Sequence, residues 1–107
     1  MEDEHKIVYE VNIELDPEIE QAYLKFLDDH IKEILHFKGF LGADLYKDDS
    51  SASPVKLVVK YRLKTEEDME NYIAHHAPAM RAQAIELFGT KFKAQRRILK
   101  TLKSFKK

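Results

Sequence analysis

Hydrophobic residues recur along this chain with a period of two, then of three to four, then two, two, three to four, and finally two. A period of two is typical of a half-buried strand, because successive side chains point to opposite faces of a sheet. A period of three to four is typical of a helix with one buried face. The pattern therefore predicts strand, helix, strand, strand, helix, strand, with strands over about 6–15, 40–46, 55–63 and 92–99.

Local signals mark the ends of the two predicted helices. Asp16 can cap the first helix and Pro17 suits its first turn, while Gly39 suits the chain reversal that follows. Thr65 can cap the second helix, with an acidic residue three positions later. Pro78 lacks a backbone N–H, so we expect the second helix to kink or restart there.

This order of elements is the ferredoxin-like βαββαβ plan. We expect an α+β fold in which two helices cover one face of a four-stranded antiparallel sheet, the second helix being interrupted at Pro78. Residues 1–107 are expected to form a single domain, with 1–5 and 100–107 as flexible ends. The opposite face of the sheet would carry no helix, and we refer to it as the open sheet face.

Composition excludes several classes of site. The 107 residues include no cysteine, which excludes disulfides, thiolate metal sites and cysteine nucleophiles. No apolar run approaches the roughly 20 residues that a membrane-spanning helix needs. The acidic N-terminus does not resemble a secretory signal. We therefore expect a cytoplasmic protein that has no membrane partner.

The two ends of the chain carry opposite charge. Residues 1–30 hold ten acidic residues and two lysines, a net charge of −8, whereas residues 91–107 hold eight basic residues and no acid, a net charge of +8. One interpretation is a basic patch for nucleic acid or another anionic surface. The favoured interpretation is mutual attraction, since the first and last strands are neighbours in a βαββαβ sheet.

The open sheet face is the predicted ligand-binding surface. Alternation in the first strand places Glu10, Asn12 and Glu14 on this face, and alternation in the third strand adds Lys56, Val58, Lys60 and Arg62. Phe40, Asp44 and Tyr46 would come from the second strand if Leu41, Ala43 and Leu45 face the core.

The last strand is ambiguous, because Arg96 shares the parity of Phe92, Ala94 and Ile98, and a bulge could resolve this. The predicted ligand-binding residues are Glu10, Asn12, Tyr46, Lys60, Arg62 and Arg96.

No residue pattern identifies a reaction. His30 lies on the apolar stripe of the first helix, where it could be a general base, although a histidine at the edge of the core is the favoured interpretation. Glu10 is the other weak candidate for a base. No spacing matches a metal site, and no glycine-rich loop for phosphate is present, so no metal and no cofactor are expected. The third strand lacks the exposed aromatic residues on which RNA bases stack, which makes nucleic acid an unfavoured partner.

Several short segments together resemble a known family. They are His30-Ile31, Gly39-Phe40, Val59-Lys60-Tyr61, Ala77-Pro78 followed by Arg81 and Ala84, and Phe88-Gly89-x-Lys91-Phe92-x-Ala94 with Arg96. Over nearly the whole chain they resemble the small bacterial domain-of-unknown-function family 4286. The chain departs from the family at Tyr23 and Phe26, where tryptophan is expected, and at Lys32, where proline often stands.

The resemblance implies a place in the dimeric α+β barrel group, in which two sheets pack face to face. Members range from cofactor-independent monooxygenases to proteins without known activity. Two hypotheses follow. The first is a non-catalytic homodimer that binds a ligand or partner through the open sheet face. The alternative is a cofactor-independent monooxygenase- or isomerase-like enzyme acting on a small oxygenated substrate, with Tyr46, Asn12, Lys60 or Arg62 binding it and His30 or Glu10 as the base.

Overall fold

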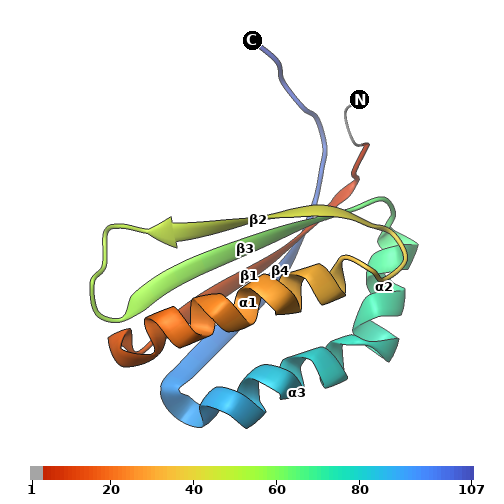
Figure 1. Cartoon of the computed structure of the whole chain (residues 1–107). Helices are drawn as coiled ribbons and strands as arrows, with labels where there is room; N and C mark the ends of the chain where they lie inside the picture. The colour runs from red at the N-terminus through yellow and green to blue at the C-terminus, as the bar shows by residue number, and fades with distance from the viewer. Residues whose placement is uncertain (1–3) are drawn as a thin grey trace.

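The computed structural model describes residues 4–107 and contains the predicted order of elements (Figure 1). Strand β1 spans Ile7–Leu15, followed by the short helix η1 (Pro17–Ile19) and helix α1 (Glu20–Ile34). Strands β2 (Phe40–Asp48) and β3 (Val55–Leu63) come next. Helices α2 (Glu66–His75) and α3 (Ala77–Phe88), the turn η2 (Gly89–Lys91) and strand β4 (Phe92–Lys100) complete the chain.

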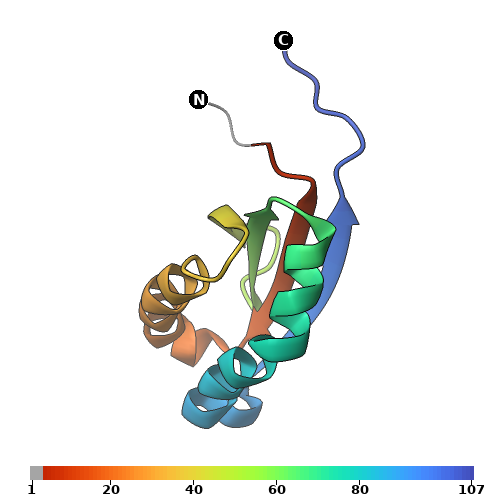
Figure 2. The ribbon, with the colours of Figure 1, turned by 90° about the vertical axis from the view of Figure 1, so that its right-hand side faces the viewer.

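The four strands form one antiparallel sheet in the order β2-β3-β1-β4. Helices α1, α2 and α3 all lie on the same side of this sheet (Figures 1 and 2). The chain therefore has the α+β ferredoxin-like fold that the hydrophobic pattern predicts. No helix within residues 4–107 is long and apolar enough to cross a membrane.

The core lies between the helices and the inward face of the sheet. The inward residues of β1 and β3 alternate with outward ones, and Tyr9, Val59 and Tyr61 are among those buried. Helix α1 contributes Tyr23 and Leu27, which confirms its predicted apolar stripe. Burial of these large side chains supplies most of the stabilising free energy, at about 1.5–3 kcal/mol for each side chain fully buried.

The helix ends agree with the sequence prediction at three points and differ at one. The Thr65 hydroxyl accepts a hydrogen bond from the Asp68 N–H and caps α2, as predicted. Helix α3 restarts beside Pro78, and Gly39 makes the reversal after α1 with a φ of 89°. Asp16, however, makes no side-chain capping bond, so its predicted role is wrong. The 3-10 turn beginning at Pro17 separates Asp16 from the first residue of α1.

A bulge at the start of β2 corrects one predicted face. The register between β2 and β3 shifts between Phe40 and Gly42, which pairs Phe40 with Leu63. Phe40 therefore points into the core and is only 9% exposed, whereas Leu41 is 42% exposed. Simple alternation had placed Phe40 on the open sheet face, because one extra residue in a strand reverses the face of everything before it.

The oppositely charged ends of the chain meet along β1 and β4. Glu10 pairs with Arg97, Glu14 with Lys93, and Glu18 with Lys91. The interpretation of mutual attraction is thus supported by the register of these two strands. Strand β4 includes Lys100, and the Thr101 N–H donates to the Lys6 carbonyl, so pairing extends into the segment predicted to be flexible. Of the predicted N-terminal flexible end, residues 1–3 lie outside the described residues.

Candidate functional site

Five of the six predicted ligand-binding residues lie together on the open sheet face. The register pairs Glu10 with Lys60 and with Arg97, which places all three side chains on one side of the sheet. Asn12 follows Glu10 on the same face, and its amide nitrogen donates to the Glu10 carboxylate at 2.9 Å. The other residues of this group lie next to them on β2 and β3, and they are Tyr46, Lys60 and Arg62.

Glu10 is the centre of the polar contacts on this face. Its side chain is covered although no helix lies above it, with only 4% of the residue exposed. Arg97 Nε donates to one carboxylate oxygen, and Lys60 Nζ lies 3.8 Å from the other. The hydrogen bonds from Arg97 and Asn12 hold the pKa of the Glu10 carboxyl below its ordinary value and outweigh the opposing effect of desolvation. A carboxylate that is so well partnered is a poor base.

The remaining charges of the open sheet face are also paired. Arg62 Nη1 donates to Asp44 at 2.6 Å, and Lys60 Nζ lies 5.6 Å from the ring centre of Tyr46. Because cations and anions alternate across neighbouring strands, the face carries little net charge. It is suited to contact another surface of the same kind without repulsion.

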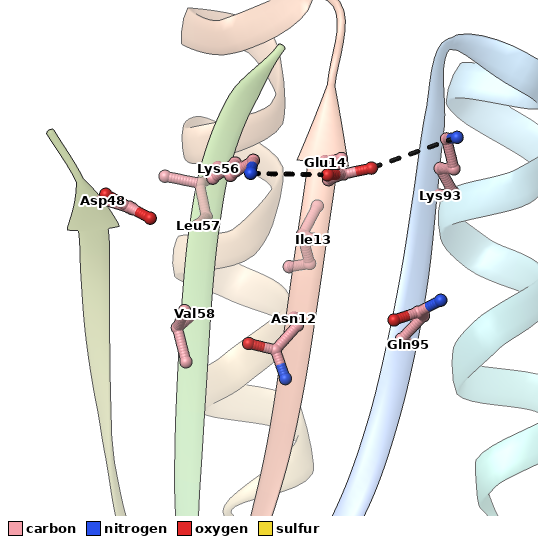
Figure 3. A pocket seen from close by; sticks show the side chains of 9 residues that line it. All are labelled: Asn12, Ile13, Glu14, Asp48, Lys56, Leu57, Val58, Lys93 and Gln95. Carbon is pink, nitrogen blue, oxygen red and sulfur yellow. Dashed lines mark ion pairs between the residues drawn. The ribbon is translucent and has the colours of Figure 1, made fainter. Parts of the chain in front are cut away.

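A groove of about 440 Å³ lies at one end of this face (Figure 3). Glu14 stands between Lys56 and Lys93, at 3.8 and 4.0 Å, and Asn12 and Gln95 supply amide groups farther along the groove. The lysine side chains are well exposed, at 41% and 83%. Water therefore competes for every polar contact that a ligand could make here in a single copy of the chain.

Arg96 does not lie on the open sheet face. It pairs with Val11 in an unbroken register between β1 and β4, so its side chain points to the same side as Phe92 and Ala94, toward the helices. A bulge would have turned Arg96 outward, but strands β1 and β4 pair without one over the residues that the structure describes. The prediction that Arg96 joins Glu10 and Asn12 is therefore wrong.

Arg96 instead lies at a small, partly open cavity between the helices and the sheet, which we call the helix–sheet cavity. Its volume is about 40 Å³, room for roughly three water molecules if one needs about 10–15 Å³. Aliphatic side chains from β1, β3, α1 and α3 form much of the wall. The polar groups are contributed by four tyrosines, two arginines and a histidine, namely Tyr9, Tyr23, Tyr61, Tyr72, Arg81, Arg96 and His30.

Arg81 of α3 is the unusual member of this cavity. Its Nη2 donates to the Tyr9 hydroxyl over 3.3 Å, and its Nε is buried without any hydrogen-bond partner. A buried donor that has lost its water without gaining a partner costs about 1–3 kcal/mol, and more if it is charged. The Arg81 guanidinium therefore has hydrogen-bonding capacity that residues 4–107 leave unused.

His30 lies at the cavity wall, at the edge of the core as the favoured interpretation stated. Its ring stacks on Phe26, and its Nδ1 lies 3.0 Å from the Gln83 side-chain oxygen. The side-chain amide nitrogen of Gln83 donates to Glu33, so the Gln83 amide oxygen is the atom that faces His30. This oxygen can only accept, so His30 Nδ1 carries the hydrogen of the neutral ring and Nε2 carries the lone pair. Burial lowers the pKa of His30 despite the opposing hydrogen bond to Gln83. His30 is thus neutral at pH 7.

Burial also raises the pKa of three of the cavity tyrosines. It raises the pKa of Tyr23 and of Tyr72 to about 12, and it raises the pKa of Tyr61 further. These phenols are therefore hydrogen-bond donors and acceptors at neutral pH, not anions. No cluster of side chains within residues 4–107 is arranged to hold a metal ion.

Sequence reasoning did not single out Tyr9 and Arg81 as candidate site residues. Tyr9 is a buried residue of β1, and nothing local predicts that its hydroxyl meets an arginine 72 positions later. A signal did exist for Arg81, because it directly follows Met80 and precedes Ala84 on the buried side of α3. A charged residue beside such positions indicates a special role.

The family comparison matches nearly the whole chain. The model of a family described as Domain of unknown function (DUF4286) matches residues 6–102. No curated protein shows significant sequence similarity to the chain.

Solved structures share the fold at low sequence identity. A variant of SnoaB, a cofactor-independent oxygenase from Streptomyces nogalater, is 10% identical with a TM-score of 0.70, covering 95% of this chain and 99% of that one. A dimeric ferredoxin-like protein from an uncultured marine organism is 12% identical with a TM-score of 0.72, covering 95% and 100%. A protein described as an antibiotic biosynthesis monooxygenase is 11% identical with a TM-score of 0.69, covering 91% and 99%. These similarities show that the chain shares the ferredoxin-like α+β fold of these proteins.

Proposed function

We propose that this chain, which belongs to the family described as Domain of unknown function (DUF4286), is a homodimeric protein that binds a small molecule in the helix–sheet cavity. The observation that carries the proposal is the buried Nε of Arg81, which has no partner within residues 4–107. A bound molecule that accepts a hydrogen bond there removes the cost of the unsatisfied donor. The ligand site thus moves from the open sheet face, where we had predicted it, to the other side of the same sheet.

The open sheet face is, in this proposal, the surface that pairs two copies. Its ion pairs are formed within one chain, so a second copy meets a face of low net charge. Its outward residues also include Val8, Val58 and Tyr46, of which Tyr46 is 49% exposed. One structural neighbour is described as dimeric, which is consistent with this arrangement. Because the helices lie on the opposite side, pairing of the sheets leaves both cavities accessible.

The direct test is a fragment screen followed by two-dimensional amide NMR of the labelled protein. Binding in the cavity is expected to shift the resonances of Tyr9, His30 and Arg81, which come from three separate elements.

Ala84 lines the cavity and is 7% exposed, so Ala84→Leu should fill part of it and abolish binding. Ala82 is exposed on the same helix, so Ala82→Leu is the matched control and should bind normally. Fragment shifts confined to the open sheet face, or unchanged in Ala84→Leu, would overturn the proposal.

A second candidate is a cofactor-independent enzyme of the monooxygenase or isomerase kind. The observation that favours it is the neutral His30 at the cavity wall, whose Nε2 could accept a proton from a bound substrate. Glu10 is a much weaker candidate for the base, since Arg97 and Asn12 lower its pKa. Oxygen uptake with the fragments from the screen tests for a monooxygenase, and NMR of the fragments themselves tests for isomerisation. A binding protein shows neither change, whereas uptake or isomerisation that is lost in His30→Gln would establish the enzyme.

A further inference from the structure

We propose that the ligand of the helix–sheet cavity is a small organic carboxylate, bound by the guanidinium groups of Arg81 and Arg96. This inference rests on the proposed function, because it names the chemical class of the molecule that occupies the same cavity. Three features support it: the charge at the cavity, the unused donor of Arg81, which lines it, and the aliphatic part of its walls.

The charge of the cavity is unbalanced. Most basic side chains in the sheet and helices have a carboxylate within 4.0 Å, as Arg97 has in Glu10 and Lys47 has in Glu20. Arg81 and Arg96 make no such ion pair within residues 4–107, and no aspartate or glutamate of this part of the chain lines the cavity. His30 adds no negative charge, and burial raises the pKa of Tyr23, Tyr61 and Tyr72, so none of these groups compensates. Two positive charges therefore lie at the cavity, on half-buried Arg81 and on exposed Arg96, and an anion would neutralise them.

The unused donors have the geometry for a carboxylate. A guanidinium can present Nε–H and an Nη–H side by side, which matches the two oxygens of a carboxylate. On Arg81 the Nε–H is unpartnered, and the Nη2 contact with the Tyr9 hydroxyl is long, at 3.3 Å. Arg81 is half-buried and Arg96 is exposed, so the two groups mark the rim at which a ligand can enter.

The walls favour an organic anion over an inorganic one. Aliphatic side chains contact the cavity from several elements, including Val11, Leu27, Met80 and Ala84. Phosphate or sulfate has oxygen atoms on every side, so even with the tyrosines and arginines as donors it would place some of them against these aliphatic groups without hydrogen bonds, which costs free energy. A carboxylate with a short alkyl chain directs its charge to the arginines and its carbons to the apolar wall. The cavity volume of about 40 Å³ limits the buried part to a few heavy atoms.

The experiment uses three probes that differ in one property at a time. Propionate carries the charge and the alkyl chain, propionamide carries the same shape without charge, and inorganic phosphate carries charge without an alkyl chain. Each is titrated into the full chain, and the Nε–H resonance of Arg81 is followed by NMR together with the backbone amides. Propionate should bind in the cavity and shift this resonance, propionamide should bind at least about tenfold more weakly, and phosphate should leave the cavity resonances unchanged.

Two variants and a matched control locate the charge recognition. Arg81→Lys keeps the charge but loses the paired donors, and Arg96→Gln removes one charge at the rim. Each should weaken propionate binding by about tenfold or more. Arg97 is the next residue on the strand but points to the open sheet face, so Arg97→Gln should bind propionate normally. If Arg81→Lys fails to fold by circular dichroism, Arg96→Gln decides the result.

The outcomes separate the two proposals. Equal binding of propionate and propionamide in the cavity would overturn the carboxylate inference while leaving cavity binding intact. Tighter binding of phosphate would overturn the organic class. If none of these probes binds and the fragment screen also finds nothing that Ala84→Leu blocks, both the inference and the proposed function fail.

Discussion

Arg97 Nε donates to the carboxylate of Glu10, which is only 4% exposed although it lies on the face of the sheet that no helix covers. The two residues are 87 positions apart, and they meet because β1 and β4 are neighbours with Glu10 opposite Arg97. The contact joins the acidic N-terminal part of the chain to its basic C-terminal part. It also neutralises the centre of the open sheet face.

Replacing Glu10 should make the protein less stable at neutral pH but not in acid. Glu10→Gln should lower the free energy of unfolding by about 1 kcal/mol at pH 7, because it removes the charge from the bonds to Arg97 and Asn12. The pKa of Glu10 is lower in the folded chain than its ordinary value of 4.5. Its stabilising contribution is therefore complete above pH 4.5 and disappears as the pH falls through the folded pKa.

Urea unfolding of both proteins at pH 7 and pH 3, at one protein concentration, measures this dependence. Other carboxylates titrate equally in both proteins, so the difference between them reports Glu10 alone. An equal difference at the two pH values would contradict the assignment of the lowered pKa to this carboxyl.

Gly39 and Gly89 should respond differently to alanine. Both have positive φ angles, of 89° and 56°, so alanine is strained at either by about 1–3 kcal/mol. A Cβ at Gly39 would also lie 2.3 Å from the Asp68 side chain, whereas a Cβ at Gly89 would meet nothing within 4 Å. We expect Gly39→Ala to destabilise the protein by roughly 1–3 kcal/mol more than Gly89→Ala. Denaturant unfolding decides the order, and equal losses would show that Asp68 moves aside freely.

The two polar residues that precede helices should differ in importance. The Thr65 hydroxyl accepts from the Asp68 N–H at 3.0 Å, so Thr65→Ala should cost about 1 kcal/mol. Asp16 makes no capping bond and is exposed, so Asp16→Ala should change stability by less than about 0.5 kcal/mol. Thermal and urea unfolding compare the two variants. A larger loss at Asp16 would show that it caps the first helix in solution.

An acidic residue at the centre of the open sheet face should prevent pairing of two copies. Val58 pairs with Asn12 and Tyr46 on this face, and Val58→Glu would bury an unpaired charge in the proposed interface. We expect a dissociation constant about a hundredfold higher or more, measured by sedimentation velocity. Ile85 is 59% exposed on α3, so Ile85→Glu is the control and should leave the dimer intact. A native chain that is monomeric at high micromolar concentration would contradict the proposed dimer.

Most of the fold could be predicted because strand alternation is a local property. Tyr9, Val59 and Tyr61 each follow the rule that inward residues are apolar, so the sheet and its core follow from the sequence. The error at Phe40 arose because a bulge inserts one residue without a clear signal in composition. Arg96 was misplaced by the assumption that a charged residue leaves the core side. Here a cavity lies beside it, and the long side chain reaches its rim.

The candidate site was harder to predict because its residues are distant in sequence. The Tyr9 hydroxyl and the Arg81 guanidinium come from β1 and α3, and their contact depends on how the interrupted helix crosses the sheet. No spacing rule connects positions so far apart. By contrast, the shared face of Glu10, Asn12 and Lys60 was predicted, since a strand register relates these residues directly.

A crystal structure of the full chain grown with propionate tests the central claim most directly. Propionate should lie in the helix–sheet cavity, with a carboxylate oxygen within hydrogen-bond distance of Arg81 Nε and the Arg96 guanidinium beside it. A structure in which Arg81 Nε donates to a protein carbonyl, with the cavity filled by side chains and propionate bound elsewhere, would contradict it.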